Sequence, residues 1–282
     1  MPTKKQHLST LWVGGPLSRI ERLCLASMVD CGHPVALYTY GGVPDAPAGV
    51  DLRDAREVMP ESKMIREKRT GSLALGSNLF RYRLLQKGWG TCWADCDMLF
   101  IKPLPVADYV FGWERPDSIN SAVLKLPPDS PVLENILALA DSTPVILPWW
   151  KRRRRRRERL KAWLGFGRPL EQMPWGTIGP RAVTHFLKAQ WIHTLASPIP
   201  VFYPNPATLG LDVFDPAANI ESRLTDQTIA VHLWNTEIRA AKDEPVRAGC
   251  FIDRHCKRLG LNAEGEQAAQ PLKSRAGHAG AS

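Results

Sequence analysis

The first forty residues alternate between apolar runs and polar turns. Residues 8–13 form an apolar run that ends in a glycine–proline turn, and residues 34–40 form a second run, both typical of buried strands. Between them, Ser18 and Glu21 stand at the spacing of a capping box, and apolar residues recur at helical intervals at Ile20, Leu23, Cys24 and Met28. A strand, a helix and a strand in this order form a βαβ unit, which implies a parallel sheet with a right-handed crossover.

The middle of the chain predicts a helix followed by a buried strand. Residues 41–70 are rich in Pro, Asp and Lys and are predicted to be irregular. Ser77 or Asn78 is predicted to cap a helix over residues 79–87, which Gly88 closes. An apolar strand is then predicted over residues 91–95.

The remaining pattern completes an α/β architecture. A helix is predicted from Pro131 to about Asp141 and another after the turn at residues 175–180, with further strands at 109–113, 121–126, 199–203 and 228–234. We therefore expect a mixed, mostly parallel sheet flanked by helices, in a single domain over residues 1–262. Residues 263–282 have little apolar content and are predicted to be a disordered tail.

The strongest chemical signal is a pair of aspartates at the end of the strand predicted over residues 91–95. Side chains alternate faces along an extended chain, so Asp95 and Asp97 are expected to point the same way. Two converging carboxylates repel each other unless a cation joins them, and hard oxygen ligands suit Mg²⁺ or Mn²⁺. The other interpretation is an ordinary turn after a strand, where aspartate is common.

The charge of the chain is concentrated in one segment. The 282 residues carry a formal charge of +9, and residues 151–161 hold nine Lys or Arg side chains and one Glu. The rest is close to neutral, so nucleic-acid binding is not expected of the folded body. No apolar run reaches the ~20 residues of a spanning helix, and no secretory signal is seen at the N-terminus, which favours a cytoplasmic location.

Aromatic residues flank this basic run, with Trp149 and Trp150 before it and Trp163 after it. Arginines for anionic head groups beside Trp and Leu for the interface are typical of a peripheral membrane segment. We interpret residues 149–166 as an insertion that binds an anionic membrane surface and holds the protein at the inner membrane face. A solvated flexible insertion is the second interpretation, and a nucleic-acid site is the third.

Several blocks around the two aspartates resemble a known family. They are GSLA (71–74), SNLFRYRLL (77–85), GWG (88–90) and WADCD (93–97). In combination they resemble the DXD-containing sugar-binding region of family 32-type glycosyltransferases, a group that includes α-1,4-galactosyl-, N-acetylglucosaminyl- and yeast-type α-mannosyltransferases. The HLWN block (232–235) and the WG…GP turn (175–180) are similar to its members as well. This resemblance implies a GT-A fold, a nucleotide-sugar donor, Mn²⁺ or Mg²⁺, and retention of anomeric configuration.

The resemblance also implies roles for individual residues. Asp95 would contact the metal and the donor ribose, Asp97 would bind the metal, and Arg81 would hold a donor hydroxyl or phosphate. A late histidine in related enzymes completes the metal or diphosphate shell, which makes His232 a metal ligand; its apolar neighbours equally allow a satisfied core histidine. The residues placed near the nucleotide, the transferred sugar and the acceptor are Trp12, Val13, Gly14, Glu114, Asn120, Asp212 and Asp226.

One position departs from the family. Members usually carry Ser-Asp where this chain has Ser77-Asn78, and that Asp contacts the donor in relatives. An amide can still donate and accept hydrogen bonds, so donor binding can survive with an altered preference. The same change leaves room for an inactive protein.

The sequence therefore predicts a metal-dependent retaining glycosyltransferase. It would move a hexose from a nucleotide sugar to a glycan or lipid-linked acceptor. A UDP-sugar is the first choice of donor and a GDP-sugar the second. The alternative is a non-catalytic nucleotide-sugar- or glycan-binding pseudo-glycosyltransferase. A sugar-phosphate nucleotidyltransferase is disfavoured, since residues 14–19 do not fit the G-x-G-x-R pattern of that class. The six cysteines form no C-x-x-C pair and are expected to be reduced thiols.

Overall fold

Six strands form the central sheet in the computed structural model, which describes residues 5–66, 71–174, 176–242 and 244–261. Their order is β3-β2-β1-β4-β7-β6. The strands are β1 (His7–Trp12), β2 (Val35–Thr39), β3 (Val50–Asp54), β4 (Thr91–Ala94), β6 (Val110–Arg115) and β7 (Ser118–Lys125). Strands β3, β2, β1 and β4 run parallel, whereas β7 is antiparallel to β4 and β6 to β7. The predicted mixed, mostly parallel sheet flanked by helices is confirmed. Trp175 and the tail predicted at residues 263–282 lie outside the described residues.

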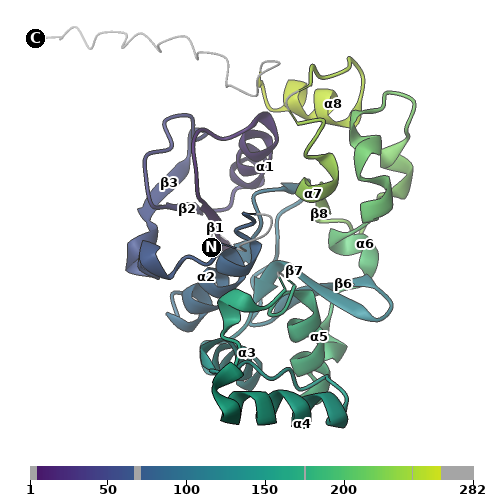
Figure 1. The fold of residues 1–282 in the computed structure, drawn as a ribbon. Coiled ribbons are helices and arrows are strands. Elements are labelled where there is room, and N and C mark those ends of the chain that lie inside the picture. The colour runs from purple at the N-terminus through teal and green to yellow at the C-terminus, as the bar shows by residue number, and fades with distance from the viewer. Residues whose placement is uncertain (1–4, 67–70, 175, 243, 262–282) are drawn as a thin grey trace, which may run out of the picture.

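Helices pack on both faces of this sheet (Figure 1). One face carries Trp93 and Leu124 and packs into the same core as α2 (Ala74–Gln86), α3 (Pro131–Asp141) and α5 (Pro180–Ala189). The other face carries Cys92 and Val123 and packs with α1 (Arg19–Asp30) and α6 (Ile199–Phe202). Neighbouring residues of β4 and β7 thus enter opposite cores, as the alternation of side chains along a strand requires.

The first βαβ unit forms as the sequence predicts. Helix α1 begins at Arg19, and both hydrogen bonds of the Ser18–Glu21 capping box are present. The Ser18 N–H donates to Glu21 Oε2 at 3.0 Å, and Ser18 Oγ accepts from the N–H of Ile20 at 3.2 Å. This reciprocal cap satisfies N–H groups that would otherwise lack a partner at the helix start, so the helix begins at a fixed residue.

Residues 41–70 are not wholly irregular, contrary to the prediction. Strand β3 lies in this segment and pairs in parallel with β2, and two short 3₁₀ turns follow at Ala55–Glu57 and Glu61–Lys63. Strand β3 is an edge strand whose side chains are mostly exposed. Edge strands carry charged residues that prevent further pairing, so the usual apolar signal of a strand is missing here.

Two other predicted boundaries are wrong. Helix α2 begins at Ala74, so Ser77 and Asn78 lie inside the helix and do not cap it. Residues 199–203, predicted as a strand, begin instead as helix α6, with Pro198 at its N-cap and proline within its first turn. Proline lacks the N–H that a sheet requires and is favoured in the first turn of a helix, which explains the helical outcome.

A second, two-stranded sheet stands beside the main one. Strand β5 (Met98–Phe100) pairs antiparallel with β8 (Ala230–His232), and α7 (Asn235–Ile238) and α8 (Phe251–Arg258) follow β8. Strand β8 is shorter than the predicted span of 228–234, and Trp234 at the end of that span takes a left-handed conformation with φ 58° that a strand does not contain. This small sheet joins the late part of the chain to the middle.

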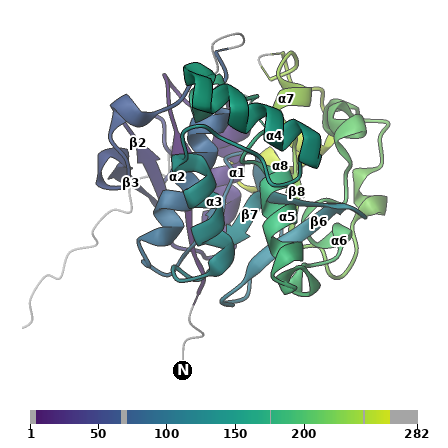
Figure 2. The same ribbon diagram turned by 60° about the horizontal axis from the view of Figure 1, so that its bottom comes forward.

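The basic run forms a helix at the periphery. Helix α4 (Arg152–Lys161) lies at the lower edge of the molecule in Figure 1 and above α2 and α3 in the view of Figure 2. A π-helical turn at Ala162–Phe166 continues it. None of the helices in the described ranges is long and apolar enough to cross a bilayer.

The cysteines are free, as expected from the sequence, and four of the six are buried. Burial raises the pKa of Cys31 and of Cys256 to about 11. These thiols are therefore protonated near neutral pH, and protonated thiols are poor nucleophiles.

Helix α8 gives a stability prediction. Burial, reinforced by Arg258 and Arg254 and opposed by Glu221, lowers the pKa of His255 to about 4. The ordinary pKa of histidine is 6.5, so between pH 6.5 and about pH 4 the unfolded chain binds a proton at His255 that the folded chain does not. We expect the free energy of unfolding to fall through this window, and His255→Gln to lose about 3 kcal/mol less than wild type. Urea titrations across this pH range measure the difference. The control is His7→Gln, at an exposed histidine; an equal loss in His255→Gln and wild type would contradict the assignment.

Candidate functional site

Asp95 and Asp97 lie in a tight turn between β4 and β5. Strand β4 ends at Ala94, and the N–H of Met98 donates to the carbonyl of Asp95 at 3.1 Å, which closes the turn. The carboxylates therefore converge through a turn, and the expectation that both belong to one extended face is wrong. The backbone N–H of Asp95 donates to Ala122 on β7 at 2.7 Å, so the turn is anchored to the main sheet.

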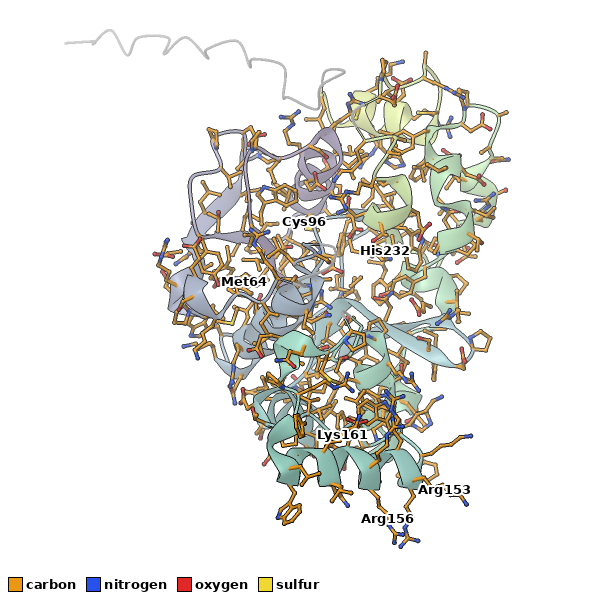
Figure 3. All side chains as sticks on the ribbon, in the orientation of Figure 1. Met64, Cys96, Arg153, Arg156, Lys161 and His232 are labelled. Carbon is orange, nitrogen blue, oxygen red and sulfur yellow. The ribbon has the colours of Figure 1, made fainter. Side chains whose placement is uncertain are left out.

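Strand pairing brings His232 to this turn. In the β5–β8 register Met98 stands opposite His232, one residue after Asp97. The N–H of Leu233 donates to the Asp97 carbonyl at 3.0 Å, which fixes the register. One ligand atom from each of Asp95, Asp97 and His232 lies within 4.8 Å of the others. Cys96, between the aspartates, and His232 both lie near the centre of the view in Figure 3.

Asp97 and His232 form a buried pair. Asp97 Oδ2 lies 3.3 Å from His232 Nε2 and accepts the backbone N–H of Asn235 at 2.8 Å. Burial alone would raise the pKa of Asp97, but His232 and the Asn235 N–H outweigh burial and lower it to about 2. Burial alone would lower the pKa of His232, but the Asp97 carboxylate raises it above its ordinary value. Asp97 is thus ionised near neutral pH, as a metal ligand must be.

Arg81 holds the other carboxylate. Its Nη2 donates to Asp95 Oδ1 at 2.5 Å, its Nη1 donates to Ser121 Oγ, and its guanidinium lies 4.8 Å from the ring centroid of Trp93. The indole N–H of Trp93 also donates to Asp95 Oδ1, at 2.6 Å. Burial raises the pKa of Asp95, and Arg81 opposes that rise by favouring the charged form. Both Asp95 contacts converge on Oδ1.

This donor set fits a divalent cation. Two carboxylates and one imidazole are ligands of Mn²⁺ and of similar ions that accept oxygen and nitrogen together. Within the described ranges this is the one group of three or more acidic, His or Cys side chains close enough to share an ion. His232 Nδ1 is buried and finds no hydrogen-bond partner among the described residues, so the ring is not fully satisfied as an ordinary core histidine would be.

The residues predicted to face the transferred sugar lie on the β6–β7 hairpin. Asn120 Nδ2 donates to Glu114 Oε2 at 2.6 Å, and Ser118 Oγ donates to Glu114 Oε1 at 2.8 Å. Asn120 Oδ1 accepts the N–H of Ala122, whose carbonyl in turn accepts the N–H of Asp95. The Glu114 carboxylate also contributes to the raised pKa of His232. The hairpin therefore belongs to the same electrostatic site.

The residues predicted to receive the nucleotide lie at the carboxyl end of β1. Trp12 donates its indole N–H to the Gly15 carbonyl at 2.8 Å, and Gly14 has φ 132°, in the region that favours glycine. The end of β1 touches the aspartate turn, since Thr10 Oγ1 lies 3.1 Å from Cys96 Sγ. Val13 follows directly and is half-buried. Ligands of parallel sheets bind at this end of the strands.

Asn78 lies on α2, one turn before Arg81. Its side chain is buried and lies against Gly179, where an added Cβ would stand 3.3 Å from Asn78 Nδ2. Glycine at 179 thus leaves room for the amide. Asp212 instead pairs with Arg223 at 2.6 Å, and the Asp226 carbonyl accepts from Lys102 at 2.5 Å.

Two contributors, Ser121 and Lys242, were missed by sequence reasoning, whereas Asn235 lies in the HLWN block that resembles the family. Ser121 binds Arg81, the backbone of Asn235 binds Asp97, and Lys242 Nζ bonds Asn235 Oδ1 at 2.8 Å and also pairs with the buried Glu21. The Lys242 ammonium also lies 6.0 Å from the Trp12 ring centroid. No local pattern marks Ser121 or Lys242, since each acts through a contact with a distant part of the chain.

Comparisons with known proteins give little further identification. No protein-family model matches the chain, and no curated protein matches it significantly. Among solved structures it is similar to one titled "PaToxG Glycosyltransferase", with a TM-score of 0.42 and 12% sequence identity over 67% of this chain and 70% of that one. A likeness at this TM-score establishes neither a shared fold nor a shared activity.

Proposed function

We propose that this protein is a metal-dependent retaining glycosyltransferase with a GT-A-type fold that transfers a hexose from a nucleotide sugar, UDP-linked first and GDP-linked second. The observation that carries the proposal is the convergence of Asp95, Asp97 and His232 beside the carboxyl end of β1. The acceptor is a glycan or a lipid-linked hydroxyl. Retention and the family 32-type assignment follow from the resemblance of the motif blocks.

Some residues of this site would bind the metal, and others hold those metal ligands in position. Asp95, Asp97 and His232 would hold Mn²⁺ or Mg²⁺, which when bound neutralises charge on the departing diphosphate. Arg81 and Trp93 fix the Asp95 carboxylate in place. Arg81 therefore positions a metal ligand, in addition to any contact that it makes with the nucleotide sugar. The Asn235 N–H fixes Asp97 in the same way. Carboxylates held by such partners need little rearrangement when a ligand arrives.

The nucleotide and the sugar would lie on either side of the aspartate turn. Trp12, Val13 and Gly14 stand at the end of β1 and would receive the base and ribose. Glu114 and Asn120 stand on the hairpin and would face the hexose, with their mutual hydrogen bond orienting both groups. Lys242 lies near the Trp12 ring, and because its ammonium pairs with the buried Glu21 it would position this end of the site.

The test is a panel of nucleotide sugars followed by thermal shift with and without Mn²⁺. A ligand that binds only the folded state raises the melting temperature by mass action, so the true donor should give a metal-dependent rise. Hydrolysis of that donor in the absence of acceptor then tests for turnover. No shift with any UDP- or GDP-sugar in the presence of Mn²⁺ would contradict the proposal.

A second candidate is a non-catalytic protein that binds a nucleotide sugar or a glycan. It is favoured by Asn78, because the buried α2 position where relatives carry a carboxylate holds an amide. The same panel separates the two: the binding protein shows a metal-dependent shift without donor hydrolysis or transfer.

Position 78 yields a direct prediction. Asn78→Asp should fold and should raise turnover or shift the preference among UDP-galactose, UDP-N-acetylglucosamine and GDP-mannose. The reason is that a carboxylate returns one helical turn from Arg81, whose charge compensates it. Steady-state rates with the three donors measure the effect, and Asn135→Asp on α3 is the control. An unfolded or kinetically unchanged variant would show that Asn78 does not face the donor.

A further inference from the structure

Helix α4 and the turn after it, residues 151–166, form a surface that the proposed activity does not use. We refer to these residues as the α4 segment. It contains nine Lys or Arg side chains and one carboxylate, so it holds a net +8 of the chain's formal +9. All but one of these nine side chains are exposed. A charge this concentrated sets a strong local potential whatever the rest of the surface carries.

The carboxylate of the segment is covered by neighbouring cationic side chains. Glu158 is buried and lies within 4.0 Å of Arg157, Lys161 and Arg168, at 3.3, 3.2 and 3.6 Å. The opposite side of the helix carries Arg152, Arg153 and Arg156, which make no ion pair within the described ranges. Arg153 and Arg156 project from α4 away from the body of the protein in Figure 3. The outer face is therefore purely cationic.

The fold leaves this charge uncompensated. Helix α4 has no acidic residue in its first turn and no side-chain hydrogen bond at its N-cap. Arginines four apart repel each other, as Arg152 and Arg156 do, and positive charge at a helix N-terminus opposes the helix dipole. An anionic partner outside the protein would remove both penalties.

Apolar side chains are exposed directly after the cations. The exposed fractions are 57% for Leu160, 81% for Trp163, 54% for Leu164 and 73% for Phe166. Four of the eleven large apolar side chains found exposed in the described part of the chain thus fall within seven residues. Clustered apolar exposure of this kind indicates an interaction surface.

The arginines and the exposed apolar side chains, taken together, distinguish between a nucleic acid and a lipid bilayer as the anionic partner. A nucleic-acid backbone would neutralise the arginines, and its bases could stack on Trp163, but Leu160 and Leu164 would stay in water. A bilayer surface accommodates both sets, since its phosphates meet the guanidinium groups and its interface takes Trp, Phe and Leu side chains. A bilayer surface is therefore the partner that suits both the positive charge and the exposed apolar side chains.

We propose that the α4 segment docks the protein on an anionic lipid bilayer. Arg152, Arg153 and Arg156 contact the lipid phosphates, and Trp163 and Phe166 insert at the interface. The bound state is peripheral and reversible, and it depends on salt because exposed charges are screened beyond ~10 Å at about 0.1 M. This inference is independent of the proposed activity, since no ligand of the Asp95–Asp97 site lies in the segment.

Vesicle flotation of the full chain tests the proposal. Wild type should bind vesicles of phosphatidylcholine with phosphatidylglycerol, should not bind phosphatidylcholine alone, and should dissociate at high salt. The triple variant Arg152→Gln, Arg153→Gln, Arg156→Gln should bind about 100-fold more weakly. The matched variant with Lys at the same three positions should keep most of the binding, because it keeps the charge. Trp163→Ser with Phe166→Ser should retain salt-sensitive attraction and lose quenching of tryptophan fluorescence by brominated lipid.

Several results would overturn the proposal. They are absence of wild-type binding to the anionic vesicles at low salt, equal binding by the triple Gln variant, or unchanged quenching in the Trp163 and Phe166 variant. Tighter, arginine-dependent binding of single-stranded RNA without vesicle binding would assign the surface to nucleic acid instead. Circular dichroism and the melting temperature, neither of which depends on the proposed activity, show whether each variant is folded, so a loss of vesicle binding is not a loss of structure.

Discussion

Asp97→Asn abolishes metal-dependent binding of UDP while the fold stays intact. The substitution removes a carboxylate that is ionised near neutral pH, because its pKa is lowered to about 2, and that stands with Asp95 and His232 within 4.8 Å. Substitutions of residues that merely support a metal site already weaken binding by about 10–100-fold, so loss of a ligand should cost about 100-fold or more. Calorimetric titration of UDP in the presence of Mn²⁺ measures the change.

The structure explains why this variant should still fold. An asparagine oxygen at position 97 can accept the Asn235 N–H that Asp97 Oδ2 accepts at 2.8 Å. The protein should therefore stay folded without metal, although its melting temperature should fall because the pair between Asp97 and His232 is lost. Asp129→Asn, at an exposed aspartate in the turn after β7, is the matched control and should bind as wild type does. Equal Mn²⁺-dependent affinity in wild type and Asp97→Asn would remove the metal site from the proposed function.

Arg81→Met destabilises the protein by up to about 3 kcal/mol, the low end of the cost of removing one partner of a buried ion pair, because Arg81 is buried whereas the Asp95 side chain is 27% exposed. Arg81 is 4% exposed and donates to both Asp95 and Ser121. Its loss leaves the Asp95 carboxylate without its cation in a site where burial already raises the Asp95 pKa. Arg81→Lys should cost less but should not restore wild-type stability, because an ammonium cannot reproduce the forked geometry. Urea denaturation gives the free energies of unfolding.

The same helix supplies the control. Arg83 pairs with Asp141 at 2.5 Å, but its side chain is 31% exposed and that of Asp141 54% exposed. Exposed pairs contribute about 0–1 kcal/mol, so Arg83→Met should be mild. The double variant Arg81→Met with Asp95→Asn should recover part of the stability, since the uncompensated carboxylate is gone. If Arg81→Met proved as mild as Arg83→Met, Arg81 would not be the residue that holds Asp95.

Local sequence determined the elements that depend on neighbouring residues. The Ser18–Glu21 cap, the helix after Ser130 and the glycine after helix α2 each act within a few residues, and the structure has them where the pattern predicts. Composition likewise located the cationic segment, since a run of arginines is visible without any fold. The adjacency of Asp95 and Asp97 was also evident from the sequence. Their carboxylates converge because of a turn, however, and not because they share one face of an extended strand.

Only the tertiary structure decided what the distant residues do. His232 joins the aspartates because β5 pairs with β8 in one register, and Arg81 reaches Asp95 because α2 packs beside β4. Strand β3 was missed because an edge strand can carry charged residues in place of an apolar pattern, and α6 was misassigned as a strand because its prolines favour a helical first turn. The outward direction of Arg153 and Arg156 follows from the burial of Glu158. Local propensity acts over a few residues, whereas the site and the outer surface are set by strand pairing and burial between segments far apart in the sequence.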